Sequence, residues 1–274
     1  MTKTSIEELL EHIRNHCCYT HPVFKNWAAV APVPEVVGAL FHQIQCFCAS
    51  TRPGWNFPMA LESLGLQGES KLLQEILESE EDHGLELATM AGFILNRAAK
   101  REICPDIYDQ VAVEAKLKEY SNQLLSGLPG YDLETGLTAQ ARKVLSVFER
   151  RKLTNRESTF RNLGSTLALE IIANRQVIPG EKHCLVDSGL YEANMDDREM
   201  HYLVEHWGEI GAEQQHEKNA SAAIMSVLNE ESEPLIMEGV NDFLDSLASL
   251  WDILDAALLQ SSYKQVAGEA AKAA

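Results

Sequence analysis

Apolar residues recur every three or four positions along most of the chain, which is the spacing of amphipathic helices. Ile6, Leu9, Leu10 and Ile13, for example, fall on one face of a helix. The alternating pattern of half-buried strands is nearly absent, and no glycine- or serine-rich linker divides the chain. We therefore predict an all-α bundle, as a single domain over 1–265 with a disordered tail over 266–274. Helices are predicted at 5–18, 35–50, 58–65, 69–98, 107–126, 138–151, 158–177, 196–228 and 233–265.

Two polar residues interrupt the apolar stripe of the helix predicted at 69–98. Glu80 and His83 stand between Ile76 and Leu87 on that stripe. Residues three apart lie on the same face of a helix, so both side chains are expected to point toward the core. A buried carboxylate without a partner is unfavourable. The alternative interpretation of this segment alone is a solvated acidic patch.

A lone acid lies within the most apolar part of the helix predicted at 158–177. Glu170 is flanked by Ala168, Leu169, Ile171 and Ile172. A helix this apolar is expected to be buried on most sides, which leaves little room to place Glu170 in solvent. The alternative is a core glutamate paired with an arginine.

The helix predicted at 196–228 repeats the Glu-x-x-His spacing. Glu213 and His216 lie on its apolar stripe, with Glu209 one turn before Glu213 and His206 two turns before it. A charged surface helix would explain this segment alone. Which of Glu209 and His206 turns inward is left open.

Taken together, two Glu-x-x-His pairs and a buried glutamate on a third helix are the ligand inventory of a carboxylate-bridged di-iron site. Imidazole and carboxylate both suit iron, and the charges of two Fe(II) ions would be balanced by Glu80, Glu170, Glu209 and Glu213. The helix at 35–50 offers no further inward acid. Its stripe places Gln45 and His42 there instead, and we interpret these as residues that line a substrate pocket or bond a ligand. Trp207 and Arg175 are further candidates, as a pocket wall and as a partner for a substrate carboxylate.

At these residues the sequence resembles the haem-oxygenase-like di-iron oxidases and oxygenases, the family of the CADD-like proteins and of the decarboxylase that forms 1-undecene. Glu80 and His83 correspond to the Glu-x2-His element, Glu170 to the later lone glutamate, and Glu213 and His216 to the Asp-x2-His element. Glu209 or His206 would then stand for the family's first histidine, and Gln45 replaces its first glutamate. The resemblance implies a haem-oxygenase-like bundle of seven to eight helices, about two Fe(II) ions per chain and O2 as co-substrate. It also implies oxidation of a small acid, amine or amino acid by C–C cleavage, N-oxygenation or desaturation, often in specialised metabolism.

Composition narrows the classes of partner. The formal net charge of −18 argues against nucleic acid and against an anionic membrane surface. The six cysteines form no zinc-type pair, and the polar N-terminus is no signal peptide, so we expect free thiols in the cytoplasm. A small-molecule substrate is the expected partner, and a homodimer is left open.

Three alternatives to the di-iron hypothesis remain. One is a metal-free enzyme of the TenA or PqqC type with the same fold. Another is a haem protein with His12, His16 or His21 as the axial ligand. The third is a non-catalytic acidic interaction protein, in which the inward glutamates form structural ion pairs.

Overall fold

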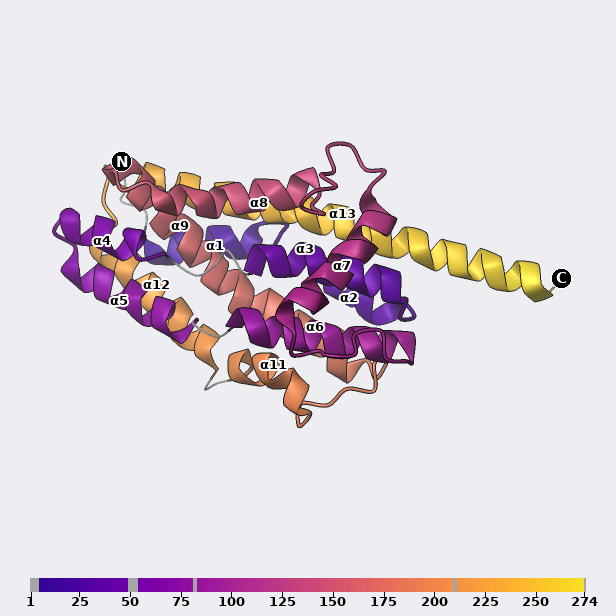
Figure 1. The fold of residues 1–274 in the computed structure, drawn as a ribbon. Coiled ribbons are helices and arrows are strands. Elements are labelled where there is room, and N and C mark those ends of the chain that lie inside the picture. The colour runs from indigo at the N-terminus through magenta and orange to yellow at the C-terminus, as the bar shows by residue number, and fades with distance from the viewer. Residues whose placement is uncertain (1–4, 49–53, 81–82, 209–210, 274) are drawn as a thin grey trace.

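The computed structural model describes residues 5–48, 54–80, 83–208 and 211–273, and these form an all-α bundle (Figure 1). The predicted fold class is confirmed. Within the described ranges, the only β pairing is an isolated bridge between Asp132 and Leu137. Eight described helices exceed ten residues, in agreement with the predicted number. These are α3 (Pro34–Cys48), α5 (Gln67–Ser79), α6 (His83–Ala99), α7 (Gln110–Leu125), α8 (Ala139–Glu149), α9 (Arg156–Ile172), α12 (Ala212–Val227) and α13 (Glu233–Ala273).

Shorter helical elements connect the long ones. They are α1 (Ile6–Asn15), α2 (Val23–Ala29), α4 (Asn56–Ser63), α10 (Ile178–Lys182) and α11 (His201–His206), with π-helical turns at Ala173–Val177 and His183–Asp187 and 3-10 turns at Arg150–Lys152 and Arg198–Met200.

Helices α9 and α13 pack against each other through glycines. A Cβ atom added at Gly164 would lie 1.9 Å from the carbonyl oxygen of Ile236, and one added at Gly239 would lie 1.9 Å from that of Arg161. Only residues without a Cβ allow the two backbones to approach this closely. The crossing holds α9, and with it Glu170, at a fixed place in the bundle.

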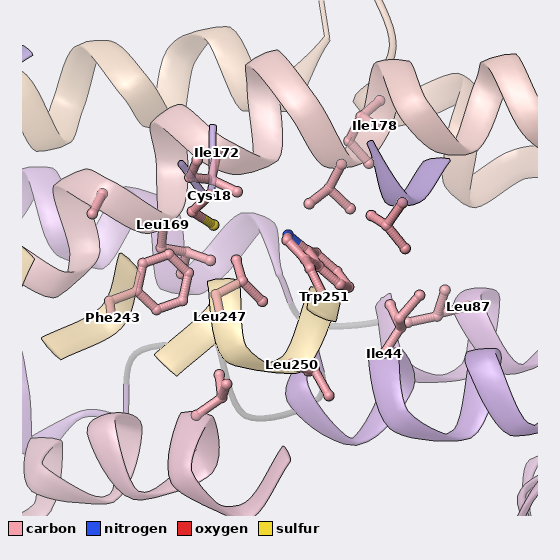
Figure 2. Packing of buried hydrophobic residues seen from close by; sticks show 14 of the residues in the cluster. Cys18, Ile44, Leu87, Leu169, Ile172, Ile178, Phe243, Leu247, Leu250 and Trp251 are labelled. Atoms are coloured by element: carbon pink, nitrogen blue, oxygen red, sulfur yellow. The ribbon is translucent and has the colours of Figure 1, made fainter. Parts of the chain in front are cut away.

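Buried side chains of α9 and α13 pack together in the core (Figure 2). Trp251 and Phe243 of α13 and Ile172 of α9 are buried there. The indole nitrogen of Trp251 donates a hydrogen bond to Gln176 Oε1 at 3.2 Å, and Gln176 Nε2 donates to the carbonyl of Cys18 at 2.5 Å. These bonds satisfy the polar atoms of an otherwise apolar core.

The N-terminal segment is joined to α13 by a row of polar contacts. Each contact pairs a ring or amide nitrogen of the first segment with an oxygen on α13. The pairs are His12–Asn241 at 2.7 Å, His16–Asp245 at 3.1 Å, His21–Asp252 at 3.3 Å and Asn26–Asp255 at 2.8 Å. The three histidines considered above as haem ligands therefore have partners within the bundle.

The structure divides two helices that the sequence predicts as continuous. The predicted helix at 69–98 is α5 and α6, with Glu80 directly after the end of α5 and His83 at the start of α6. The predicted helix at 196–228 is α11 and α12, because the chain leaves helical geometry at Trp207 and Gly208 has a φ of +96°.

Other boundaries also differ. Helix α2 was not predicted. The predicted stop at Pro179–Gly180 is wrong, because Pro179 falls in the first turn of α10, where its missing N–H is not needed. Helix α13 continues to Ala273 where a disordered tail was expected, since this segment is rich in strong helix formers.

Among the described residues, no helix combines the length and the apolar character that crossing a membrane requires. All six cysteines lie in the described residues, and none forms a disulfide bond.

Candidate metal centre

Five elements bring their ends or faces together at one cluster of histidines and carboxylates. Glu80 follows α5, His83 opens α6, His206 ends α11, and Glu213 and His216 lie in the first turns of α12. Glu170 is contributed by α9. The stretch 162–172 of α9 is buried without interruption, and Glu170 is only 4% exposed. The expectation that this helix buries its acid is thus confirmed.

The first half of the cluster contains Glu80, His83 and His206. His83 Nδ1 lies 2.7 Å from Glu80 Oε2 and 3.2 Å from His206 Nε2. His206 Nδ1 donates to the carbonyl of Tyr202 at 2.5 Å, which leaves its Nε2 as the nitrogen with a lone pair. Two ring nitrogens and one carboxylate oxygen therefore converge on one point.

The second half is centred on His216. Its Nδ1 lies 3.4 Å from Glu80 Oε1, 3.5 Å from Glu170 Oε2 and 4.0 Å from Glu213 Oε2. Its Nε2 lies 2.6 Å from the hydroxyl of Ser79, which itself donates to the carbonyl of Ile76 at 2.9 Å. Because that hydroxyl proton is already used, Ser79 accepts from Nε2–H, and Nδ1 is the nitrogen that faces the carboxylates.

Two carboxylates connect the halves. Glu80 presents Oε2 to His83 and Oε1 to His216. Glu213 presents Oε1 to His206 at 3.8 Å and Oε2 to His216. In each of the triads Glu80–His83–His206 and Glu80–Glu213–His216, the potential ligand atoms lie within 4.8 Å of one another. The two groups adjoin, share Glu80, and could each hold a metal ion.

The close carboxylates and imidazoles shift one another's pKa values. Burial disfavours the charged His216 ring, but the neighbouring carboxylate of Glu170, together with those of Glu213 and Glu80, raises its pKa to about 9. Burial, then the negative charge of Glu170, raises the pKa of Glu213 well above its ordinary range. The second half therefore holds extra protons at neutral pH.

Burial and neighbouring charges also shift the pKa values of the three residues in the first half. Burial would raise the pKa of Glu80, but the bond to His83 and its charge lower it below the ordinary value. Burial would also lower the pKa of His83, yet the same bond raises it. His206 is different, because burial and the positive charge of His83 lower its pKa to about 4, so it is neutral at pH 7. A neutral imidazole is the form that binds metals.

The donor set fits a pair of transition-metal ions. Imidazole nitrogens and carboxylate oxygens are ligands that iron accepts. Two buried atoms in the cluster, His216 Nδ1 and Glu213 Oε2, have no hydrogen-bond partner among the described residues. Buried polar atoms are rarely left in that state, and a cation between them would satisfy both.

The structure places the remaining predicted ligand residues as follows. His206 lies inside the cluster, whereas Glu209 lies outside the described residues. Gln45 donates to Glu114 Oε1 at 3.2 Å, and His42 Nε2–H donates to the carbonyl of Thr135 at 3.0 Å. Both line a pocket between α3, α7 and α8, and none of the cluster residues lines it.

The two other substrate-binding candidates lie near the surface. Arg175 Nε is 3.1 Å from Glu217 Oε2 and its guanidinium is already engaged in that ion pair. Trp207 is 40% exposed, with Lys182 Nζ 5.1 Å from its ring centroid. A substrate role for either residue stays a prediction.

Sequence reasoning missed one buried acid near the cluster. Glu181 on α10 is only 1% exposed, and its negative charge contributes to the raised pKa of Glu213. Burial raises the pKa of Glu181 itself to about 8. Its isolation in an otherwise apolar stretch after Gln176 was an available indication. The Pro179–Gly180 pair, interpreted as a helix end, obscured it.

A buried cation near Glu170 was also missed. The Arg151 guanidinium donates to Thr166 Oγ1 at 2.7 Å, one helical turn before Glu170. Burial lowers the pKa of Arg151 to about 10, and the charges of Glu170 and Glu80 counteract part of that effect. Arg151 follows Arg150 in a charged run, a pattern typical of exposed positions.

Comparison with models of protein families, with curated proteins and with solved structures finds no match to this chain. The fold and the cluster define an all-α protein with a candidate dinuclear metal centre.

Proposed function

We propose that this chain is a non-haem di-iron oxidase or oxygenase that uses O2 to oxidise a small acid, amine or amino acid. The observation that carries the proposal is the shared use of Glu80 and Glu213. Each directs one oxygen toward each half of a buried cluster that also contains three imidazoles and Glu170. Structural ion pairs alone do not require two carboxylates that each face both halves, nor do they leave His216 Nδ1 without a hydrogen bond.

The protein would hold the first ion through Glu80, His83, His206 and Glu213, and the second through Glu80, Glu170, Glu213 and His216. Such a pair of ions, when bound, supplies the redox electrons for reaction with O2. The chain would contribute orientation and exclusion of water. Tyr202 fixes the ring of His206, Ser79 fixes the ring of His216, and the apolar faces of α9 and α12 surround the centre.

The test is anaerobic loading with Fe(II), followed by removal of free metal and measurement of iron per chain. We expect about two irons per chain in the wild type. Glu170→Ala should lose at least one of them, while Glu157→Ala, an exposed acid on the same helix, should bind iron as the wild type does. Equal iron content in the wild type and Glu170→Ala, or no iron in the wild type, would overturn the proposal.

Activity is tested separately. Iron-loaded protein is mixed with O2 in an oxygen electrode, with fatty acids, amino acids and amines as separate additions. We expect one class to accelerate O2 consumption and to yield an oxidised product by mass spectrometry. The same protein loaded with Zn(II), which has no redox chemistry, is the control and should consume none.

A further inference from the structure

A pocket of about 370 Å³ lies between α3, α7, α8 and the turn at 131–138. It contains none of the residues of the metal centre. Its lining combines acceptor groups with two apolar walls. The residues are His42, Gln45, Cys46, Glu114, Thr135, Leu137 and Leu145.

The polar groups of this pocket present lone pairs. Gln45 is buried, and its Oε1 has no hydrogen-bond partner among the described residues, because its Nε2 is the atom that donates to Glu114. An unpaired buried acceptor in a cavity wall indicates a missing donor. His42 donates through Nε2 to Thr135, so its Nδ1 is the acceptor of the neutral ring.

The pocket also carries a negative charge. Glu114 Oε1 accepts from Gln45 at 3.2 Å and from Gln110 at 2.8 Å, and these two amides are neutral. Within the described part of the chain, Glu114 forms no ion pair with a lysine or arginine. The nearby Lys118 instead donates to the carbonyl of Glu134. The charge of Lys118 acts on His42 and Cys46 of the pocket, but its ammonium group is bonded elsewhere, so a cation could still pair with the half-buried carboxylate of Glu114.

The backbone turn at Gly136 packs closely against His42. Gly136 has a φ of +74°, and a Cβ added there would lie 2.7 Å from His42 Nε2. Glycine at this position allows the turn to close over His42. The acceptors are consequently held in place by the fold before any ligand binds, which limits the entropy lost on binding.

We propose that this pocket binds the ammonium group of a small organic amine, with Gln45 Oε1 and Glu114 as acceptors and Leu137 and Leu145 against its hydrocarbon part. The charge of Glu114 and the bare acceptor atoms favour a cationic ligand over an anionic one, and the apolar walls disfavour a free metal ion. The proposal does not depend on iron or on oxidase activity.

The experiment measures binding of benzylamine at pH 7.5 by isothermal titration calorimetry, with benzyl alcohol and benzoate as neutral and anionic compounds of similar size. We expect saturable binding of about one benzylamine per chain and at least ~10-fold weaker binding of the other two. Glu114→Gln and Gln45→Leu should each weaken benzylamine binding at least ~10-fold. Gln123→Leu, an exposed glutamine on the same helix as Glu114, should leave it unchanged.

Circular dichroism of each variant establishes that it is folded. Absence of saturable binding for both benzylamine and n-pentylamine in the folded wild type would overturn the proposal. So would equal binding of benzoate, or benzylamine binding that Glu114→Gln leaves intact. Glu170→Ala should retain amine binding even if it loses iron, so that failure of this proposal and failure of the metal proposal can be told apart.

Discussion

Oε1 of Glu80 lies 3.4 Å from Nδ1 of His216, across the boundary between α5 and α12. The other oxygen of the same carboxylate lies 2.7 Å from Nδ1 of His83 on α6. The carboxylate of Glu80 thus faces an imidazole in each half of the cluster, so a change in its charge alters the electrostatic environment of both.

Replacing Glu80 by glutamine should therefore weaken both metal positions together. The amide keeps the size of the side chain but removes the charge and one acceptor oxygen. We expect metal affinity to fall by at least ~10–100-fold, measured as iron per chain by elemental analysis after gel filtration. Glu78→Gln, an exposed acid on α5, is the matched control. Wild-type iron content in Glu80→Gln would contradict the shared role.

Ser79 should influence the metal only through His216. Its hydroxyl accepts from His216 Nε2 at 2.6 Å and fixes which nitrogen faces the carboxylates. Ser79→Ala should reduce metal affinity by about 10–100-fold without abolishing binding, measured by competition with a chelator. Ser63→Ala is the control, because that hydroxyl also donates to a backbone carbonyl but has no histidine partner. Equal affinities in the two variants would rule out this orienting role.

Metal binding should become tighter as the pH rises. The pKa of His216 is about 9 and that of Glu213 is well above its ordinary range, so metal must displace protons at neutral pH. We expect the apparent dissociation constant for Mn(II) to fall steadily from pH 6.5 to pH 9 and then to level off. Proton release in weakly buffered solution checks the same linkage. A dissociation constant that does not change over this range would contradict it.

The stability of the metal-free protein should respond to Glu181 in a defined pH window. Burial raises the folded-state pKa of Glu181 to about 8, above its ordinary value near 4.5, so ionisation opposes folding. The stability that the protonated Glu181 contributes is fully present below about pH 4.5 and is lost as the pH rises toward 8.

Glu181→Gln removes this titration. The variant should gain stability relative to the wild type as the pH rises from 5 to 8, by up to a few kcal/mol or several degrees in Tm. Thermal unfolding at pH 5, 6, 7 and 8 gives the difference, with Glu192→Gln, an exposed acid, as the control. A difference that stays constant with pH would exclude Glu181 as its source.

The contact between α9 and α13 should tolerate no side chain. Gly164→Ala would place a Cβ 1.9 Å from a backbone oxygen, so the helices must separate. We expect destabilisation of about 1–3 kcal/mol or more by chemical unfolding, and weaker metal binding because α9 carries Glu170. Gly68→Ala, at a helical glycine with open space around it, should instead stabilise by roughly 0.5–1 kcal/mol. Similar effects of the two substitutions would contradict the close packing.

Polar residues within the apolar helix stripes predicted the central residues of the cluster. For Glu80 and His83, the argument assumed one continuous helix, which the structure does not have. Glu80 and His83 were placed together because residues three apart share a helical face. In the structure α5 ends at Ser79 and α6 begins at His83, so the two residues belong to different helix ends, and their side chains still lie 2.7 Å apart. Glu170 was predicted on a continuous helix, and there the argument from burial holds directly.

The positions of His206, Gln45 and Glu181 depend on tertiary contacts, which the local hydrophobic pattern of the sequence does not reveal. The break after His206 turns that residue inward, and it arises from Gly208 in a left-handed conformation. Gln45 was expected at the position of an absent glutamate, yet its amide bonds to Glu114 of α7, a residue 69 positions away in the sequence. Glu181 is brought near Glu213 by π-helical turns on both sides of α10, which periodicity does not predict.

The row of contacts between the N-terminal segment and α13 sets the order in which the molecule can be completed. Its four pairs join residues 229 to 231 positions apart. Contacts of such separation form late, because the intervening chain must first be ordered. At about 5–20 residues per second, ribosomal synthesis leaves the first helix waiting roughly 10–50 s for its partner. Until α12 and α13 have been made, α1 lacks the two helices that it contacts, so its apolar side chains Leu9 and Ile13, which are buried in the folded protein, lack part of their packing.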